Sequence, residues 1–212
     1  YYKKRINFEV FHVLTDGTGA TEFLKELVSN YLYLAHQKEG LEPVSMLPED
    51  MTVQDQESDS FLKYYSKDQK RPKEKKIRAF QIRRKKKDGN HLHVHESVVS
   101  VKEVLKRSRE LGVSMTVFLT AVFLKAIHEE MSKMQEKKPI VLMVPVNLRK
   151  FFPSTSMLNF FNWIEPGYDF SKQDRNFEAV LGYTKEFFKE QLTKEKMSAH
   201  INDLLALELH PI

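Results

Sequence analysis

The 212-residue sequence predicts an α+β protein in which helices flank a β-sheet. Three observations support this class. Apolar residues at 6–13 follow the pattern of a strand, whereas those at 21–38 recur at helical spacing. A continuous apolar run at 139–146 is typical of a fully buried strand. Two longer stretches, 115–135 and 176–194, again show the spacing of helices.

The chain is predicted to open with a strand, a turn and a helix. β-Branched and aromatic residues at 6–13 (INFEVFHV) favour a strand that is buried or nearly so. The turn TDGTGA follows and leads into the helix at 21–38. Gly40 lies where this helix should stop, because glycine readily adopts the left-handed conformation that ends helices.

The middle of the chain is predicted to hold two strands and two helices. Lys76–Arg84 alternates apolar and basic residues, which suits an edge strand, and His91–Val99 follows after an Asp-Gly turn. Ser100 and Glu103 form a capping box for a helix through Leu111. The next helix, 115–135, is apolar nearly all round in its first half, which predicts a place at the centre of a domain.

One segment carries the net positive charge. Lys67–Lys87 has twelve basic residues against two acidic ones, a local balance of +10, so the rest of the chain carries −5. An acidic stretch, 43–60, precedes it, and adjacent blocks of opposite sign predict a solvated excursion from the core. No recognition helix, zinc module or pair of stacking aromatic residues accompanies the basic segment, so we expect no nucleic-acid partner.

Composition excludes several classes of protein. The absence of cysteine rules out a disulfide scaffold, a thiolate metal site and a cysteine nucleophile. The first twelve residues lack the apolar stretch of a signal peptide. The longest apolar-rich run, Met115–Ile127, is shorter than the roughly 18 to 20 residues that span a bilayer. We therefore expect a cytoplasmic protein without a membrane span.

His12, Asp16 and Gly17 form an H-x-x-x-D-G motif between the first strand and the first helix. An imidazole at a strand end can face a cleft and take a proton from a hydroxyl or amine near neutral pH. We expect Asp16 to hold the turn by pairing with a cation elsewhere. The alternative is that His12 is a buried core histidine and Asp16 only caps the following helix.

His91, His93 and His95 lie on one face of the predicted strand 91–99 and raise the possibility of a metal site. Same-face neighbours along a strand are spread about 7 Å apart, which is unfavourable for binding one ion. We therefore interpret them as a polar strand face and expect no metal.

The motif FHVLTDGTGA, the segment PVNLRKFFP and the later MLNFFNW together resemble the CoA-dependent acyltransferase superfamily. This superfamily includes chloramphenicol acetyltransferase, alcohol acetyltransferases and peptide-synthetase condensation domains. Residues 99–127 resemble the helix pair that opens the second half of its members. The resemblance covers most of the chain. Phe11 replaces a histidine found in many members, and Leu158 stands where a glycine is expected.

The resemblance implies a chloramphenicol-acetyltransferase-like mixed sheet flanked by helices, spanning parts of two half-domains. Residues 1–70 would be the end of the first half-domain, with the H-x-x-x-D-G motif, and 71–212 the start of the second, with V-N-L-R. Because members generally need two complete halves, it also implies an incomplete enzyme that pairs with the rest of the fold or with another copy.

The resemblance further implies that acyl-CoA is a cosubstrate, with no bound cofactor, and that acetyl is transferred to a small alcohol or amine. His12 would be the general base, and Asp16 and Arg149 a structural ion pair. Three asparagines within residues 144–163 are candidate donors of hydrogen bonds to the oxyanion: Asn147, Asn159 and Asn162. Two alternatives stay open: a condensation domain that uses carrier-protein thioesters, and a non-catalytic half-domain or basic-patch binding module.

Overall fold

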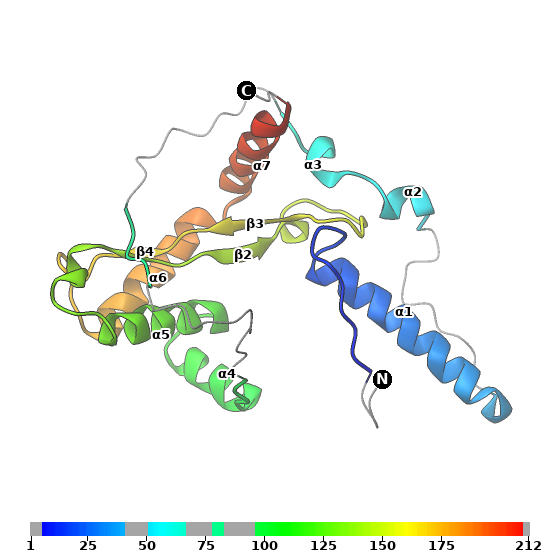
Figure 1. The fold of residues 1–212 in the computed structure, drawn as a ribbon, viewed down its shortest axis with the longest axis horizontal. Coiled ribbons are helices and arrows are strands. Elements are labelled where there is room, and N and C mark those ends of the chain that lie inside the picture. The colour runs from blue at the N-terminus through cyan, green and yellow to red at the C-terminus, as the bar shows by residue number, and fades with distance from the viewer. Residues whose placement is uncertain (1–5, 41–50, 67–77, 83–95, 210–212) are drawn as a thin grey trace, which may run out of the picture. The chain divides into compact units, whose positions relative to one another are not determined.

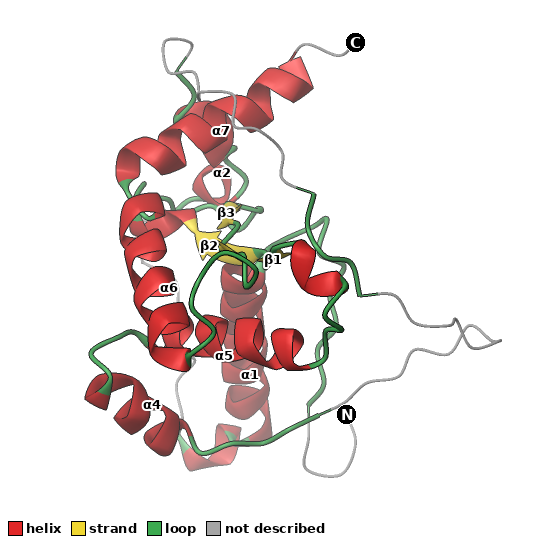
Figure 2. Ribbon diagram, turned by 90° about the vertical axis from the view of Figure 1, so that its left-hand side faces the viewer, coloured by secondary structure: helices red, strands yellow, loops and turns green. Residues whose placement is uncertain are grey.

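A computed structural model describes residues 6–40, 51–66, 78–82 and 96–209 (Figure 1). Helices predominate over strands in these ranges (Figure 2). The elements are, in chain order, α1 (Gly17–Ala35), η1 (Gln37–Glu39), α2 (Val53–Gln56), α3 (Ser60–Lys63), α4 (Val101–Glu110), α5 (Met115–Glu129), η2 (Gln135–Lys137), β1 (Ile140–Val141), β2 (Val144–Asn147), η3 (Leu148–Lys150), β3 (Phe161–Ile164), β4 (Gly167–Tyr168), α6 (Phe177–Gln191) and α7 (Lys194–Leu209).

The chain divides into two compact units. The first comprises residues 1–71, 145–162 and 194–212, and the second comprises 72–144 and 163–193. The boundary after residue 71 lies beside the boundary expected from the sequence, but 145–162 and 194–212 fold with the first unit. That the units belong to two halves of a larger enzyme stays a prediction.

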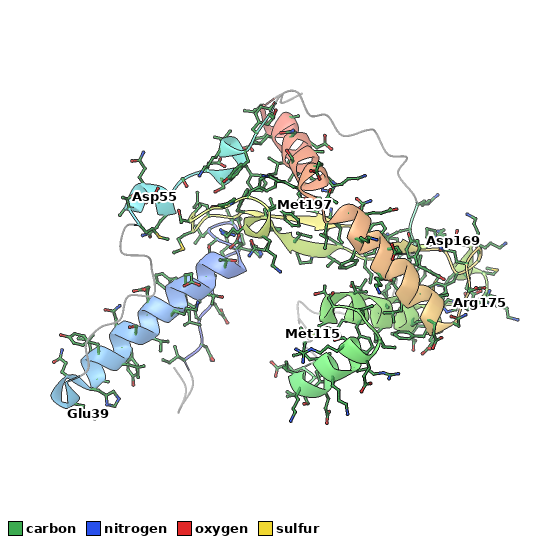
Figure 3. All side chains as sticks on the ribbon, turned by 180° about the vertical axis from the view of Figure 1, so that it is seen from behind. Glu39, Asp55, Met115, Asp169, Arg175 and Met197 are labelled. Atoms are coloured by element: carbon green, nitrogen blue, oxygen red, sulfur yellow. The ribbon has the colours of Figure 1, made fainter. Side chains whose placement is uncertain are left out.

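In the first unit, helix α7 packs against α3. Met197, labelled on α7 in Figure 3, is fully buried, as is Ile201 one turn later. Phe160 contacts the rings of Phe61 and Tyr64, with ring centroids 5.3 and 6.0 Å away. An apolar core therefore sits directly beside the end of β2.

Part of the acidic stretch 43–60 contacts the segment 154–157 within this unit. Ser60 is 4% exposed, and its hydroxyl lies 2.6 Å from the hydroxyl of Ser154. The Gln56 carbonyl accepts a hydrogen bond of 2.8 Å from the backbone N–H of Met157. The acidic side chains Asp55, Glu57 and Asp59 are exposed, as a solvated excursion predicts. The stretch is nevertheless attached to the rest of the unit through Gln56 and Ser60.

In the second unit, helices α5 and α6 pack together beside a small antiparallel sheet. Strand β1 pairs with β4, with Ile140 opposite Tyr168. Helix α5 buries only one face: Ala121 and Leu124 are fully buried, whereas Phe123 is 60% exposed. Helix α5 contacts α4, α6 and β1, as expected of a helix at the centre of a domain, but its apolar residues are not buried all round.

The predicted helices are present, and serine or asparagine side chains cap three of them. Ser100 accepts a hydrogen bond from the Glu103 N–H at 3.3 Å at the start of α4. Ser114 and Asn176 cap α5 and α6 in the same way. Gly40 adopts φ 70°, a left-handed conformation, but it ends η1, because α1 already stops at Ala35. Helix α5 is shorter than predicted, because it ends at Glu129.

The predicted strand at 6–13 is wrong. These residues form no strand, and Phe11 is 73% exposed. No described strand lies alongside to pair its backbone groups, and strand backbone needs such partners. The described parts of the predicted strands 76–84 and 91–99 are not strands either. His91, His93 and His95 lie outside the described residues.

The apolar run 139–146 is divided into two short strands. β1 pairs with β4, whereas β2 pairs with β3. Met143, between them, is 67% exposed. The run was expected to be one fully buried strand, which is wrong because its two ends join different sheets. The observed fold is nevertheless a mixture of helices and small sheets, which confirms the α+β class.

No single helix among the described residues is long and apolar enough to cross a membrane. Helices α4 and α5 reach that length and hydropathy only as a pair, and the pair is bent by 89° at the break between them.

Candidate active site

The H-x-x-x-D-G motif forms a tight turn at the start of α1, in the first unit. The Leu14 N–H donates to the Phe11 carbonyl at 2.9 Å, which closes the turn. Asp16 has extended backbone angles and caps the helix, because its Oδ1 accepts from the N–H groups of Thr18 and Gly19 at 3.0 and 3.1 Å. This cap explains why α1 begins at Gly17, four residues before the predicted start.

The second carboxylate oxygen of Asp16 binds Arg149. Asp16 Oδ2 accepts from Arg149 Nη1 at 2.6 Å and from the Phe160 N–H at 2.8 Å. The side chains of Asp16 and Arg149 are only 6% and 11% exposed. The structure therefore brings together the two residues that were expected to pair. The alternative role of Asp16 as a helix cap is also present, because each oxygen serves one of the two functions.

The pKa of Asp16 is lower than that of an ordinary aspartate. Burial alone raises the pKa, but hydrogen bonds from Arg149, the Phe160 N–H and the Gly19 N–H, together with the Arg149 charge, outweigh it. The carboxylate is therefore ionised at neutral pH and keeps its attraction for the guanidinium.

Arg149 also shapes the loop that follows η3. Its Nη2 donates to the carbonyl oxygens of Ser156 at 2.7 Å and Leu158 at 2.9 Å. Its backbone N–H donates to Asn147 Oδ1 at 3.0 Å. One planar guanidinium thus joins the helix cap to two carbonyls of the loop, which suits the fixed geometry of its donors.

Two contacts beyond the ion pair tie the start of α1 to the second motif. Thr15 Oγ1 donates to the Met157 carbonyl at 2.5 Å. Asn147 Nδ2 donates to Thr18 Oγ1 at 3.0 Å. Hydrogen bonds on both sides of Asp16 therefore reinforce the contact that Arg149 makes.

The structure explains one of the two glycines of TDGTGA. A Cβ atom on Gly19 would collide with Thr15 Oγ1 and the Met157 carbonyl, so only glycine allows this close approach. A Cβ atom on Gly17 would meet nothing within 4 Å. Gly17 was a candidate site residue on the sequence, whereas the steric requirement falls on Gly19.

His12 lies at the exposed side of the turn. The residue is exposed, and its ring contacts the ring of Phe161, with centroids 5.3 Å apart. The alternative that His12 is a buried core histidine is therefore wrong. Asp16 makes its hydrogen bonds to Arg149 and to backbone N–H groups, so it orients the turn that carries the imidazole.

The three candidate oxyanion donors do not lie at one place. The amide of Asn147 donates to Thr18 at the start of α1, and that of Asn159 donates to the carbonyl oxygens of His12 and Val13 in the turn. Asn162 is 1% exposed, and its Oδ1 lies 3.4 Å from His200 Nδ1 on α7. The described amide donors of Asn147 and Asn159 are thus directed at the protein itself.

Sequence reasoning missed Thr15, Gly19, Met157 and Phe160. The two glycines in TDGTGA were a usable signal for a close backbone approach. Met157 and Phe160 had no such signal, because they contribute backbone groups that every residue possesses. Within the described ranges, no group of three His, Asp or Glu side chains could hold a metal ion.

A substitution pair tests the close approach at Gly19. We expect Gly19→Ala to destabilise the protein, because its methyl group collides with a carbonyl oxygen that the loop holds in place. We expect Gly17→Ala to be neutral or stabilising by up to about 1 kcal/mol, since alanine favours helices. Urea unfolding measures both. Equal changes in the free energy of unfolding in the two variants would contradict the close backbone approach at Gly19.

A double-mutant cycle tests the ion pair. Asp16→Ala and Arg149→Ala should each lower the free energy of unfolding by about 3–5 kcal/mol, because each leaves a buried charge without its partner. The double variant should lose much less than the sum of the two. Additive losses in urea unfolding would show that the two side chains do not interact.

Acid should weaken the protein through Asp16. Its pKa is lowered on folding, so its contribution is complete above the ordinary value of 3.8 and is lost as pH falls through the folded pKa. The free energy of unfolding should therefore fall less steeply below about pH 4 in Asp16→Asn than in the wild type. If the free energy of unfolding fell equally steeply with decreasing pH in both proteins, the contribution of Asp16 would be refuted.

A comparison with known protein families matches the part of the chain that contains the V-N-L-R motif. A family model described as alcohol acetyltransferase matches residues 42–163. No curated protein matches the chain. The matched segment contains Asn147, Arg149 and the loop 156–160. The turn at 12–16 precedes the matched segment and is bound to it by the Asp16–Arg149 pair. Because the match covers more than half of the chain, this protein belongs to the alcohol acetyltransferase family.

Proposed function

We propose that the protein transfers an acetyl group from acetyl-CoA to a small alcohol or amine, with His12 as the general base. The observation that carries this proposal is that His12 is exposed on a turn that a buried ion pair joins to the family segment. Family membership supports an alcohol as the acceptor and acetyl-CoA as the donor.

The reaction needs one base and no covalent intermediate. His12 takes the proton of the acceptor hydroxyl, and the oxygen attacks the carbonyl carbon of the thioester. The tetrahedral intermediate collapses with cleavage of the carbon–sulfur bond. The thiolate of CoA leaves and takes the proton from the imidazolium, which restores the neutral base.

Among the described histidines, the surroundings of His12 suit this role best. His128 stacks on Phe170, and its side chain is 10% exposed. His200 is 8% exposed. His36 is exposed, but it pairs with Glu39 at the far end of α1. A general base must be reachable by its substrate and oriented by its neighbours, and His12 meets both requirements.

The proposal includes the finer features implied by the resemblance: a chloramphenicol-acetyltransferase-like fold, Asp16 and Arg149 as positioning residues, and a cytoplasmic location. The family match favours acetyl-CoA over carrier-protein thioesters, so the condensation-domain alternative is weaker. A binding role of the basic segment Lys67–Lys87 stays an alternative, and most of this segment lies outside the described residues.

Substitution of His12 tests the proposal. His12→Ala should lower kcat for acetyl transfer by about 100- to 10,000-fold, because general base catalysis contributes this much. Release of the CoA thiol from acetyl-CoA, measured with a series of short alcohols and amines, follows the reaction. His36→Ala is the matched control and should retain activity. Turnover of His12→Ala within a few-fold of the wild type would refute the base assignment.

A further inference from the structure

We propose that Asn159 is a positioning residue for His12. Its side chain connects the loop held by the Asp16–Arg149 pair to the backbone of His12 and so fixes the direction of the imidazole. This inference rests on the proposed function, because it presumes that His12 is the base. The ion pair holds Asp16 four residues away from His12 in the chain, and Asn159 contacts the backbone of His12 itself.

One amide group of Asn159 holds two successive peptide groups of the turn. Asn159 Nδ2 donates to the His12 carbonyl at 2.9 Å and to the Val13 carbonyl at 3.1 Å. Between them these bonds fix the peptide plane on the C-terminal side of His12 and the next one. Since the imidazole is attached to the first of these backbone units, the direction in which it leaves the turn depends on this amide.

Asn159 is itself held from both sides by the ion pair. The carbonyl of Leu158, the residue before it, accepts from Arg149 Nη2 at 2.9 Å. The N–H of Phe160, the residue after it, donates to Asp16 Oδ2 at 2.8 Å. Both members of the ion pair therefore hold the backbone on either side of Asn159, and the Asn159 side chain continues the connection to His12.

The chemistry of the position calls for an amide. Two carbonyl oxygens need two N–H donors from one short side chain, and the Asn amide supplies both. A carboxylate there would place oxygen against oxygen. The other amide atom, Oδ1, is buried and accepts no hydrogen bond from the described residues. The donors of Asn159 are thus the part of the side chain that the structure uses.

A double-mutant cycle with His12 distinguishes positioning from simple support. Asn159→Ala should lower kcat about 10- to 100-fold, since small displacements of a catalytic group have effects of this size. The KM for acetyl-CoA should stay within about twofold. In the His12→Ala background the same substitution should cause no further loss, because Asn159 acts through the imidazole.

Asn159→Asp provides a second variant of nearly equal volume that lacks both donors, in case the alanine variant fails to fold. Asn30→Ala is the matched control, since the Asn30 amide bonds only a carbonyl within exposed α1. Melting temperatures establish that each variant is folded. Loss of folding in both Asn159 variants would make the residue structural and overturn the inference.

The outcomes separate this inference from the proposed function. The positioning role alone would be overturned if Asn159→Ala lowered kcat equally in the wild type and in the His12→Ala background. It would also be overturned if Asn159→Ala left kcat unchanged while His12→Ala lowered it. Full activity of His12→Ala would instead overturn the proposed function, and this inference with it. Loss of kcat in Asn159→Ala that disappears in the His12→Ala background supports the role.

Discussion

The buried ion pair between Asp16 and Arg149 is the interaction on which the rest of the site depends. A buried charge is tolerated only when its hydrogen-bonding capacity is met. Asp16 meets this condition with donors from the α1 N-terminus, the guanidinium and the Phe160 N–H. Arg149 meets it by adding the carbonyls of Ser156 and Leu158. Three chain segments are thus held by one pair of charges.

This arrangement separates the rigid part of the site from the reactive part. Charged and close-packed contacts occupy the buried side of the turn, including the approach at Gly19 that admits no side chain. His12 lies on the exposed side. A base that must meet a substrate needs both accessibility and a fixed direction. Asn159 joins the two sides, because its amide reaches from the held loop to the His12 backbone.

These contacts connect the segment matched by the family model to the histidine motif that precedes it. The matched segment 42–163 holds the arginine and the loop, whereas the histidine lies before it. Sequence comparison alone therefore leaves the relation of the two motifs open. The 2.6 Å contact between Arg149 and Asp16 places them in one unit of the fold. The function proposed here depends on this spatial relation more than on either motif alone.

Local features of the sequence were enough to predict α1, α4, α5 and α6, because apolar spacing and caps such as Ser100 act within a few residues. The pairing of Asp16 with Arg149 was expected only through a family resemblance. Tertiary structure decided the remaining features. Strands need partners distant in the chain, so 6–13 has strand composition without a strand, and 139–146 divides between two sheets. The need for glycine at 19 and the role of the Phe160 N–H also depend on distant backbone atoms, which residue types do not encode.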